Sequence, residues 1–307
     1  MPGDTPRVGI VLRTKNRPWF LRRALRDIAA QTYPEWFVEI VNDGGDAADV
    51  DSAIAELAPD LQARIAVAHH GEPQGRSAAA NVGMRRLHTE FVVLHDDDDL
   101  WHPAFLTRAV DWLDAHADDI GVVARTEIVY EAESAGHPGQ FQEVGRAPFW
   151  EGLTDISYSD LLQINRFVPI AYVYRRSLHD EVGMYREDVH AAEDWEFNLR
   201  AAAKHHIGFL GGEPLAFWMQ RVGVEGETGN SMFVLADDHR RYDATVRDEA
   251  LRRYVAEFGP GLPLFLTRFI EVEVSRIVRE QLSAELDRRP SDLDRVRNRL
   301  RRVFRRG

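Results

Sequence analysis

Short apolar segments alternate with amphipathic ones over roughly the first hundred residues, and this alternation limits the fold more than any other feature. Four segments have the length and composition of buried strands: residues 8–12, 36–41, 64–68 and 91–95. Three segments between them have the periodicity of helices: residues 19–31, 49–58 and 76–87. This order predicts an α/β fold, with a mostly parallel, Rossmann-like sheet flanked by helices.

Polar residues follow three of these predicted strands. They are the cluster 13–17, Asp43 with the glycines after it, and four consecutive aspartates at 96–99. Ligands of such sheets bind beyond the carboxyl ends of the strands. We therefore expect the three polar clusters to meet at one edge of the sheet.

The second half of the chain has a more mixed pattern. Strands are expected at 121–130, 170–174 and 215–220, a helix at 192–204, and a Gly- and Pro-rich surface excursion at 134–152. Helix is expected beyond residue 235, with a break at 259–263. We predict a catalytic domain at 1–235, with a nucleotide-binding half (1–119) and an acceptor half (120–235), and a helical C-terminal extension with a basic tail at 236–307.

Composition excludes several classes of protein. Of the 307 residues, 38 are basic and 50 are acidic, and a net charge of −12 argues against general nucleic-acid binding. Cysteine is absent, so a metal would need oxygen or imidazole ligands. No apolar stretch approaches the roughly 18 residues of a membrane span, and residues 1–7 lack the apolar core of a secretory signal. We expect a cytoplasmic protein.

The aspartate run, Asp96, Asp97, Asp98 and Asp99, is costly without positive charge, because neighbouring carboxylates raise one another's pKa values. Mg²⁺ or Mn²⁺ would remove that cost, prefers oxygen ligands and can bridge a nucleotide diphosphate. The alternative is helix capping ahead of the apolar residues that follow Pro103. We predict a metal site that includes Asp98, and a capping role for Asp99.

A second acidic site begins the helix predicted at 192–204. Glu193 and Asp194 stand in its first turn, where acidic residues complement the helix dipole. A transfer that inverts the anomeric centre of a sugar also needs one carboxylate to take a proton from the acceptor hydroxyl. Asp194 could serve as that base, and Trp195 either lines an acceptor pocket or belongs to the core.

Five segments in this order resemble family 2 glycosyltransferases, which have the GT-A fold, and the resemblance extends over about residues 8–231. The segments are residues 8–18, 39–45, 75–83, 93–101 and 182–185, the last of these followed by 193–196. The resemblance implies an inverting transfer from a UDP-, dTDP- or GDP-sugar to an acceptor hydroxyl with Mn²⁺ or Mg²⁺. It also implies products such as polysaccharides, glycolipids or glycosylated metabolites.

The resemblance further implies a role for individual residues. Asp194 matches the catalytic base and Glu193 supports it, while Asp98 and Asp96 match the metal-binding ends of the DXD motif around Asp97. The residues implied for the nucleotide are Arg13, Thr14, Lys15, Asp43 and Arg76. Arg13 and Lys15 replace a proline and a tyrosine that many members carry, so the preferred nucleobase stays open. Arg221 is the candidate that closes over the diphosphate, or it is a solvated loop arginine.

The C-terminal region suggests partners beyond the substrates. Apolar residues at helical spacing between 264 and 286 predict a helix that packs on the catalytic domain or on a second subunit. Residues 295–306 are basic and amphipathic, and either contact an anionic membrane surface or are solvated. Two rival functions remain: a non-catalytic nucleotide-sugar-binding module, and a sugar nucleotidyltransferase, which would need a glycine-rich loop after the first strand.

Overall fold

The larger of two sheets is built mainly from the alternating elements of the N-terminal half. The computed structural model describes residues 6–288 except 135, 137–138, 222, 225–228 and 230–235. Within these residues the larger sheet has seven strands in the order β10-β6-β9-β4-β1-β2-β3. They are β1 (Val8–Thr14), β2 (Trp36–Asp43), β3 (Ile65–His70), β4 (Phe91–Asp96), β6 (Asp119–Ala124), β9 (Tyr172–Arg175) and β10 (His206–Leu210). Only β9 is antiparallel to its neighbours, which confirms the predicted mostly parallel sheet.

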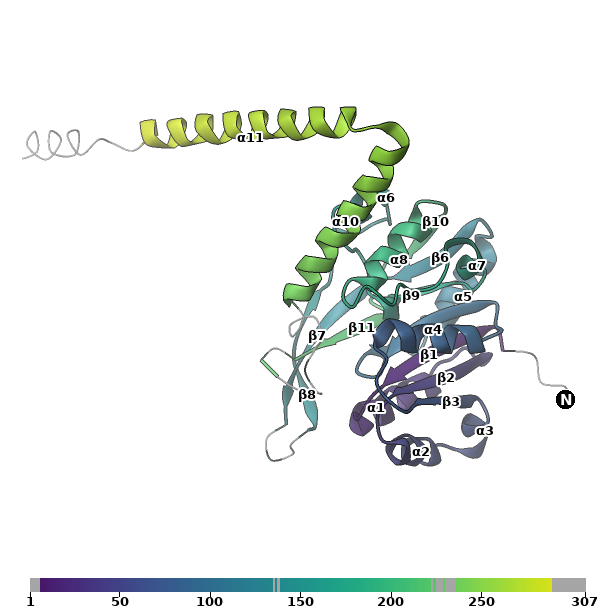
Figure 1. Ribbon diagram of the computed structural model, residues 1–307. Helices are drawn as coiled ribbons and strands as arrows, with labels where there is room; N and C mark the ends of the chain where they lie inside the picture. The colour runs from purple at the N-terminus through teal and green to yellow at the C-terminus, as the bar shows by residue number, and fades with distance from the viewer. Residues whose placement is uncertain are drawn as a thin grey trace, which may run out of the picture. The chain divides into compact units, whose positions relative to one another are not determined.

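Helices follow most of these strands, and Figure 1 shows them flanking the sheet. The chain moves outward from β1 to β3 and then returns to β4 on the other side of β1. Right-handed crossovers therefore place α1 and α4 on opposite faces. The helices of this part are α1 (Pro18–Ala29), α2 (Ala47–Ala55), α3 (Pro59–Gln62), α4 (Arg76–Arg86), α5 (Phe105–Ala115), α7 (Leu178–Val182) and α8 (Glu193–Ala202).

The smaller sheet corrects the sequence analysis in two places. Its order is β5-β11-β7-β8, from β5 (Leu100–Trp101), β11 (Ala216–Gln220), β7 (Thr126–Glu133) and β8 (Phe141–Pro148). The single strand predicted at 121–130 is wrong, because the chain changes sheets between β6 and β7. The surface excursion predicted at 134–152 is also wrong in part, because β8 pairs with β7 in an antiparallel hairpin. The segment that follows leads to α6 (Tyr158–Leu161) and the short 3₁₀ turn Pro169–Ala171.

Two long helices end the described chain: α10 (Ala236–Phe258) and α11 (Gly261–Arg288). The break between them lies where the sequence predicts it. The chain divides into two compact units, Met1–Ala244 and Thr245–Gly307, with the division inside α10. No helix in the described part of the chain is long and apolar enough to cross a membrane. The basic segment 295–306 lies outside the described residues.

Gly83 allows α4 to approach β1 closely. A β-carbon at this position would lie 2.4 Å from Cγ1 of Val11, which is fully buried and stiff because it is β-branched. We expect Gly83→Ala to lower the free energy of unfolding by about 1–3 kcal/mol, although alanine favours helices by about 1 kcal/mol. Urea unfolding measures this change.

Gly145→Ala in β8 is the matched control, because the nearest atom to its added β-carbon would lie 3.9 Å away. We expect its stability to stay within about 0.5 kcal/mol of the wild type. If Gly83→Ala proved as stable as Gly145→Ala, the close approach of α4 to β1 would not be a constraint.

Candidate active site

The carboxyl ends of β1, β2 and β4 bring the three polar clusters together, as the sequence predicts. Arg13 lies opposite Asp96 in the parallel register of β1 and β4, and Thr14 lies opposite Asn42 in that of β1 and β2. The chain reverses its direction across the sheet between β1 and β4, where ligands of such folds bind. Arg13 Nε donates to Asp96 Oδ1 over 2.9 Å, and both side chains contribute to one polar surface at this point.

Asp43 holds the loop that leads into α4. Its carboxylate accepts hydrogen bonds from the backbone N–H groups of Gln74 (2.8 Å) and Gly75 (2.9 Å). Gly75 has a φ of 98°, which favours glycine, and Arg76 follows it as the first residue of the helix. Nδ1 of His70, the register partner of Asp43 on β3, lies 2.7 Å from Asp43 Oδ1. The sequence analysis overlooked His70, which the alignment of β2 and β3 could have indicated.

The members of the aspartate run have different environments. The Thr14 hydroxyl donates to Asp97 over 2.6 Å, and Arg17 forms ion pairs with Asp97 and Asp98. Burial raises the pKa of Asp97 to about 6, and the charge of Asp98 adds to this effect. Burial also opposes ionisation of Asp98, yet the guanidinium groups of Arg17 and Arg221 lower its pKa below the usual range.

The predicted helix cap at Asp99 is wrong. The residue before α5 is Ala104, and no side chain caps that helix. Instead the run makes a tight turn into β5, and Asp99 Oδ1 accepts a hydrogen bond from the Met219 backbone N–H of β11 over 2.9 Å. Burial and the nearby charge of Asp98 raise the pKa of Asp99 well above its usual range. Asp99 therefore joins the two sheets.

Arg221 is fully buried, so the alternative of a solvated loop arginine is wrong. It forms ion pairs with Asp98 and, at 3.0 Å, with Glu131 of β7. Its guanidinium carbon lies 4.4 Å from the ring centre of Phe20 on α1. Arg23 also pairs with Glu131 and donates to the backbone carbonyl of Asp98 over 2.6 Å. The aspartate run thus rests on a buried arginine–carboxylate network.

Removing Arg221 would leave Asp98 and Glu131 with less positive charge in a buried place. We expect Arg221→Met to lower the free energy of unfolding by about 3–5 kcal/mol. Arg146→Met is the control, because Arg146 pairs with Glu127 and Glu143 on the surface with 45% of its side chain exposed. It should cost about 1 kcal/mol or less. If both variants lost the same free energy of unfolding in urea, the buried Arg221 pairs would stabilise the protein no more than the exposed Arg146 pairs do.

The second acidic site opens α8, and its helix begins after Ala192, which has a left-handed φ of 63°. Glu193 lies 3.2 Å from Nη2 of Arg76, the first residue of α4, so this site reaches the loop that Asp43 holds. The amide of Asn165 donates to Asp194 Oδ2 over 2.8 Å. Burial raises the pKa of Asp194 to about 6, and the charge of Glu193 adds to this effect.

A cavity of about 350 Å³ joins the two acidic sites. It brings together five residues selected from the sequence: Arg13, Arg76, Asp96, Glu193 and Asp194. Among the described residues, its lining leaves out six others from that selection: Thr14, Lys15, Asp43, Asp97, Asp98 and Arg221. Lys15 is exposed. Trp195 is 4% exposed, and its indole N–H donates to the Leu161 carbonyl, so it belongs to the core while it also lines the cavity.

Several lining residues escaped the sequence analysis. His239 and Asp243 come from the first turns of α10, and Phe149, Trp150, Asn165 and Trp218 come from the second half of the chain. Burial and the charge of Arg76 lower the pKa of His239. Its Nε2 is buried and has no hydrogen-bond partner within the described residues. No spacing in the sequence pairs this histidine with the acidic sites.

Oxygen is the ligand type that the site offers a metal ion. In the described part of the chain, no group of three or more acidic or histidine side chains is placed to hold one. Asp96 lines the cavity with 30% of its side chain exposed, whereas Asp98 is 10% exposed and paired with two arginines. Both carboxylates have the oxygen ligands that a hard divalent ion prefers, but only Asp96 lines the cavity, so Asp98 would reach an ion there only by giving up an arginine partner.

The sequence model of the family described as "Glycosyl transferase family 2" matches residues 9–183, more than half of the chain. The chain belongs to glycosyltransferase family 2. An uncharacterized glycosyltransferase of Bacillus subtilis, YwdF, is 31% identical over 201 residues, which are 66% of this chain and 70% of that protein. The putative glycosyltransferase EpsH of B. subtilis is 32% identical over 33% of this chain and 29% of its own.

Solved structures of glycosyltransferases share the fold. TarS of S. aureus in complex with UDP-GlcNAc superposes with a TM-score of 0.57 at 17% identity, over 83% of this chain and 74% of the TarS chain. The mannosyltransferase PcManGT of Pyrobaculum calidifontis, in complex with GDP-Man and Mn²⁺, superposes with a TM-score of 0.56 at 19% identity. The match covers 82% of this chain and 66% of the PcManGT chain. The GT-A fold expected from the sequence is therefore confirmed.

Proposed function

We propose that this family 2 glycosyltransferase moves a sugar from a nucleoside-diphosphate sugar to an acceptor hydroxyl by direct, inverting displacement. The observation that carries the proposal is the single cavity in which Asp194 lies with Arg13, Arg76 and Asp96. Displacement needs positive charge where the diphosphate departs and a base where the hydroxyl attacks. The cavity contains groups of both kinds.

Asp194 is the proposed base. With a pKa of about 6 it is ionised at neutral pH and is a stronger base than an ordinary aspartate. The amide of Asn165 holds one of its oxygens and thereby orients the carboxylate. Glu193 supports it indirectly: it pairs with Arg76, and its charge helps to raise the pKa of Asp194.

The donor is proposed to lie along the ends of β1, β2 and β4. Arg13 and Arg76 are the cations that would face its diphosphate, while Asp43, Thr14 and Lys15 would contact the nucleoside. Asp97 and Arg221 would act through the buried network that positions the aspartate run. UDP-, dTDP- and GDP-sugars all remain candidate donors, and TarS and PcManGT in complex with UDP-GlcNAc and GDP-Man support this class.

A divalent ion, Mn²⁺ or Mg²⁺, is proposed to bind through Asp96 and Asp98 together with the donor. When bound, it would supply positive charge that stabilises the departing diphosphate. The Mn²⁺ in the PcManGT complex supports this choice. Residues 1–119 would form the nucleotide-binding half and residues 120–235 the acceptor half, since Asp194 and Asn165 both belong to the latter.

Asp194→Asn tests the proposal. It removes the base but keeps the size and polarity of the side chain, so turnover should fall about 10²–10⁴-fold. Nucleotide binding should persist. Turnover is measured as nucleoside diphosphate released from UDP-, dTDP- and GDP-sugars with Mn²⁺ or Mg²⁺, and binding by calorimetry.

Asp188→Asn is the matched control, because Asp188 lies close in sequence, pairs with Arg186 and has 69% of its side chain exposed. It should turn over like the wild type. Near-wild-type turnover in Asp194→Asn would remove Asp194 as the base. Failure of every nucleotide sugar to bind the wild type would overturn the function itself.

The rate should depend on pH through the ionisation of Asp194. The base is active when deprotonated, so kcat/KM should fall about tenfold per pH unit below roughly pH 6 and level off above it. Glu193→Gln removes a charge that raises this pKa and should move the acidic limb to lower pH. Arg76, which lowers the pKa of Asp194, stays in place in that variant. A profile that is flat from pH 5 to pH 8 would contradict the assignment.

A further inference from the structure

The lining of the 350 Å³ cavity is divided in chemistry. One set is charged and includes Arg13, Arg76, Asp96 and Glu193. The other is apolar and contains six residues from beyond residue 120: Phe149, Trp150, Ile164, Val168, Pro169 and Trp218. Asp194 is connected to both sets. Its sequence neighbour Glu193 pairs with Arg76, and its partner Asn165 follows Ile164 in the sequence.

Three aromatic side chains of the apolar set, Phe149, Trp150 and Trp218, form a connected cluster, which we call the aromatic wall. The Phe149 ring centre lies 5.3 Å from that of Trp218 at 86°, and 5.7 Å from that of Trp150 at 64°. Phe149 and Trp150 follow β8, whereas Trp218 lies on β11. All three are only partly buried, so they keep surface that a ligand can cover.

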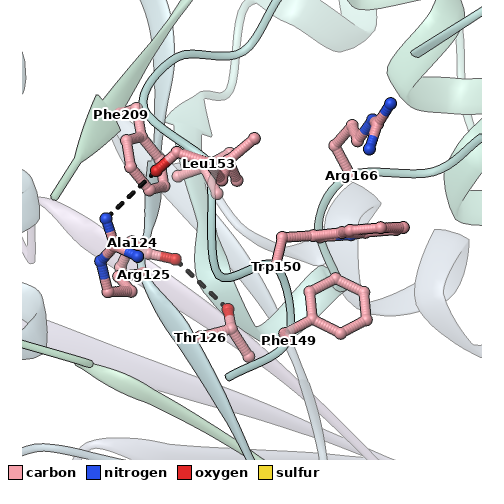
Figure 2. Close-up of a pocket in the computed structure, with 9 residues that line it drawn as sticks. Ala124, Arg125, Thr126, Phe149, Trp150, Leu153, Arg166 and Phe209 are labelled. Carbon is pink, nitrogen blue, oxygen red and sulfur yellow. Dashed lines mark hydrogen bonds between the residues drawn. The ribbon is translucent and has the colours of Figure 1, made fainter. Parts of the chain in front are cut away.

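Neighbours fix the position of Trp150. The guanidinium carbon of Arg166 lies 4.7 Å from its ring centre, and Figure 2 shows the indole between Arg166 and Phe149. The indole Nε1–H is buried, so a ligand in the cavity would meet the ring surface of Trp150 rather than this N–H. The wall thus offers flat apolar surface.

We propose, building on the function above, that the acceptor is a neutral ring compound whose hydroxyl is presented to Asp194 while an apolar ring face lies on the aromatic wall. Pockets lined by aromatic side chains with few polar groups select ligands of that character. The shared chemistry is a flat ring that carries a hydroxyl, either a pyranose or a phenolic ring. An anionic acceptor would place its charge near the Asp194 carboxylate, where its hydroxyl has to lie.

An open-chain polar acceptor fits the wall poorly. It would remove water from Phe149 and Trp218 without covering them with apolar surface, and it would gain little from their rings. The wall could instead be packing that only supports the donor's sugar. The two possibilities differ in what a substitution on the wall changes: the KM of the acceptor in the first, and that of the donor alone in the second.

The test uses the full-length protein, a donor that it hydrolyses slowly in the absence of acceptor, and Mn²⁺. Four compounds are added in turn: a methyl pyranoside, 4-methylumbelliferone, glycerol and N-acetylserine amide. Release of nucleoside diphosphate above hydrolysis measures transfer, and saturation-transfer NMR with the matching nucleoside diphosphate and diamagnetic Mg²⁺ present measures binding independently of turnover. We expect the pyranoside or the phenol to bind, and the two open-chain compounds to be inert.

Two substitutions on the aromatic wall should weaken the binding of whichever ring compound is active. Trp218→Leu removes a stacking surface and should raise its KM or Kd about tenfold. Trp150→Phe replaces the indole with a smaller ring that covers less of the ligand, and should raise the KM or Kd about three- to tenfold. Trp112→Leu, at a half-buried tryptophan outside the cavity lining, is the control and should leave the acceptor KM unchanged. Melting temperatures check that each variant is folded.

The outcomes separate cleanly. A sugar acceptor is supported if the protein transfers to the pyranoside and both wall variants raise the KM of the pyranoside. An aromatic acceptor is supported if the same holds for 4-methylumbelliferone. Transfer to glycerol or the serine amide alone, ring compounds that bind nowhere in NMR, or wall variants with an unchanged acceptor KM would each overturn the inference. If no nucleotide sugar binds to the protein, the proposed function is overturned. Binding of the ring compounds can still be measured by NMR, so the two failures are distinguishable.

Discussion

The pairing of Arg221 with Asp98 and Glu131 is the interaction on which the site depends. Asp98 follows β4 of the larger sheet, whereas Arg221 directly follows β11 and Glu131 lies on β7 of the smaller one. Buried charges are tolerated only when they are paired and hydrogen-bonded, so the sheets must meet in one arrangement. The bond between Asp99 and the Met219 backbone N–H reinforces that arrangement. The acidic turn between the sheets is therefore part of the scaffold as well as of the site.

The polar edge at the ends of β1, β2 and β4, where the donor is proposed to bind, could be predicted from the sequence because it follows from local patterns. Strand and helix periodicity predicts the parallel order, and the ends of parallel strands meet at one edge. The neighbours Arg13 and Asp96 follow from that rule. The role of Asp99 does not follow from it, because a carboxylate before an apolar helix has the sequence pattern of a helix cap. Its actual position depends on the pairing of β5 with β11, which lie more than a hundred residues apart in the sequence.

The proposed acceptor side of the cavity was less predictable, for a different physical reason. Trp150 and Trp218 lie far apart in the sequence, and half-buried aromatic residues have the same pattern whether they face a ligand or the core. The hairpin of β7 and β8 is interrupted by a Gly- and Pro-rich turn, which hides the pairing. Asn165 and His239 come from segments without periodicity that relates them to Asp194. Their convergence is a property of the tertiary structure.

Helix α10 belongs to both compact units, since the division after Ala244 falls within it. Its first two turns carry His239 and Asp243 into the lining of the cavity. A boundary drawn at residue 235, where the sequence pattern changes to continuous helix, would therefore pass between the sheets and two of the residues that line their cavity. A chain that ended at residue 235 would keep both sheets and lose part of the cavity lining, so the start of α10 belongs with the sheets rather than with the helices that follow.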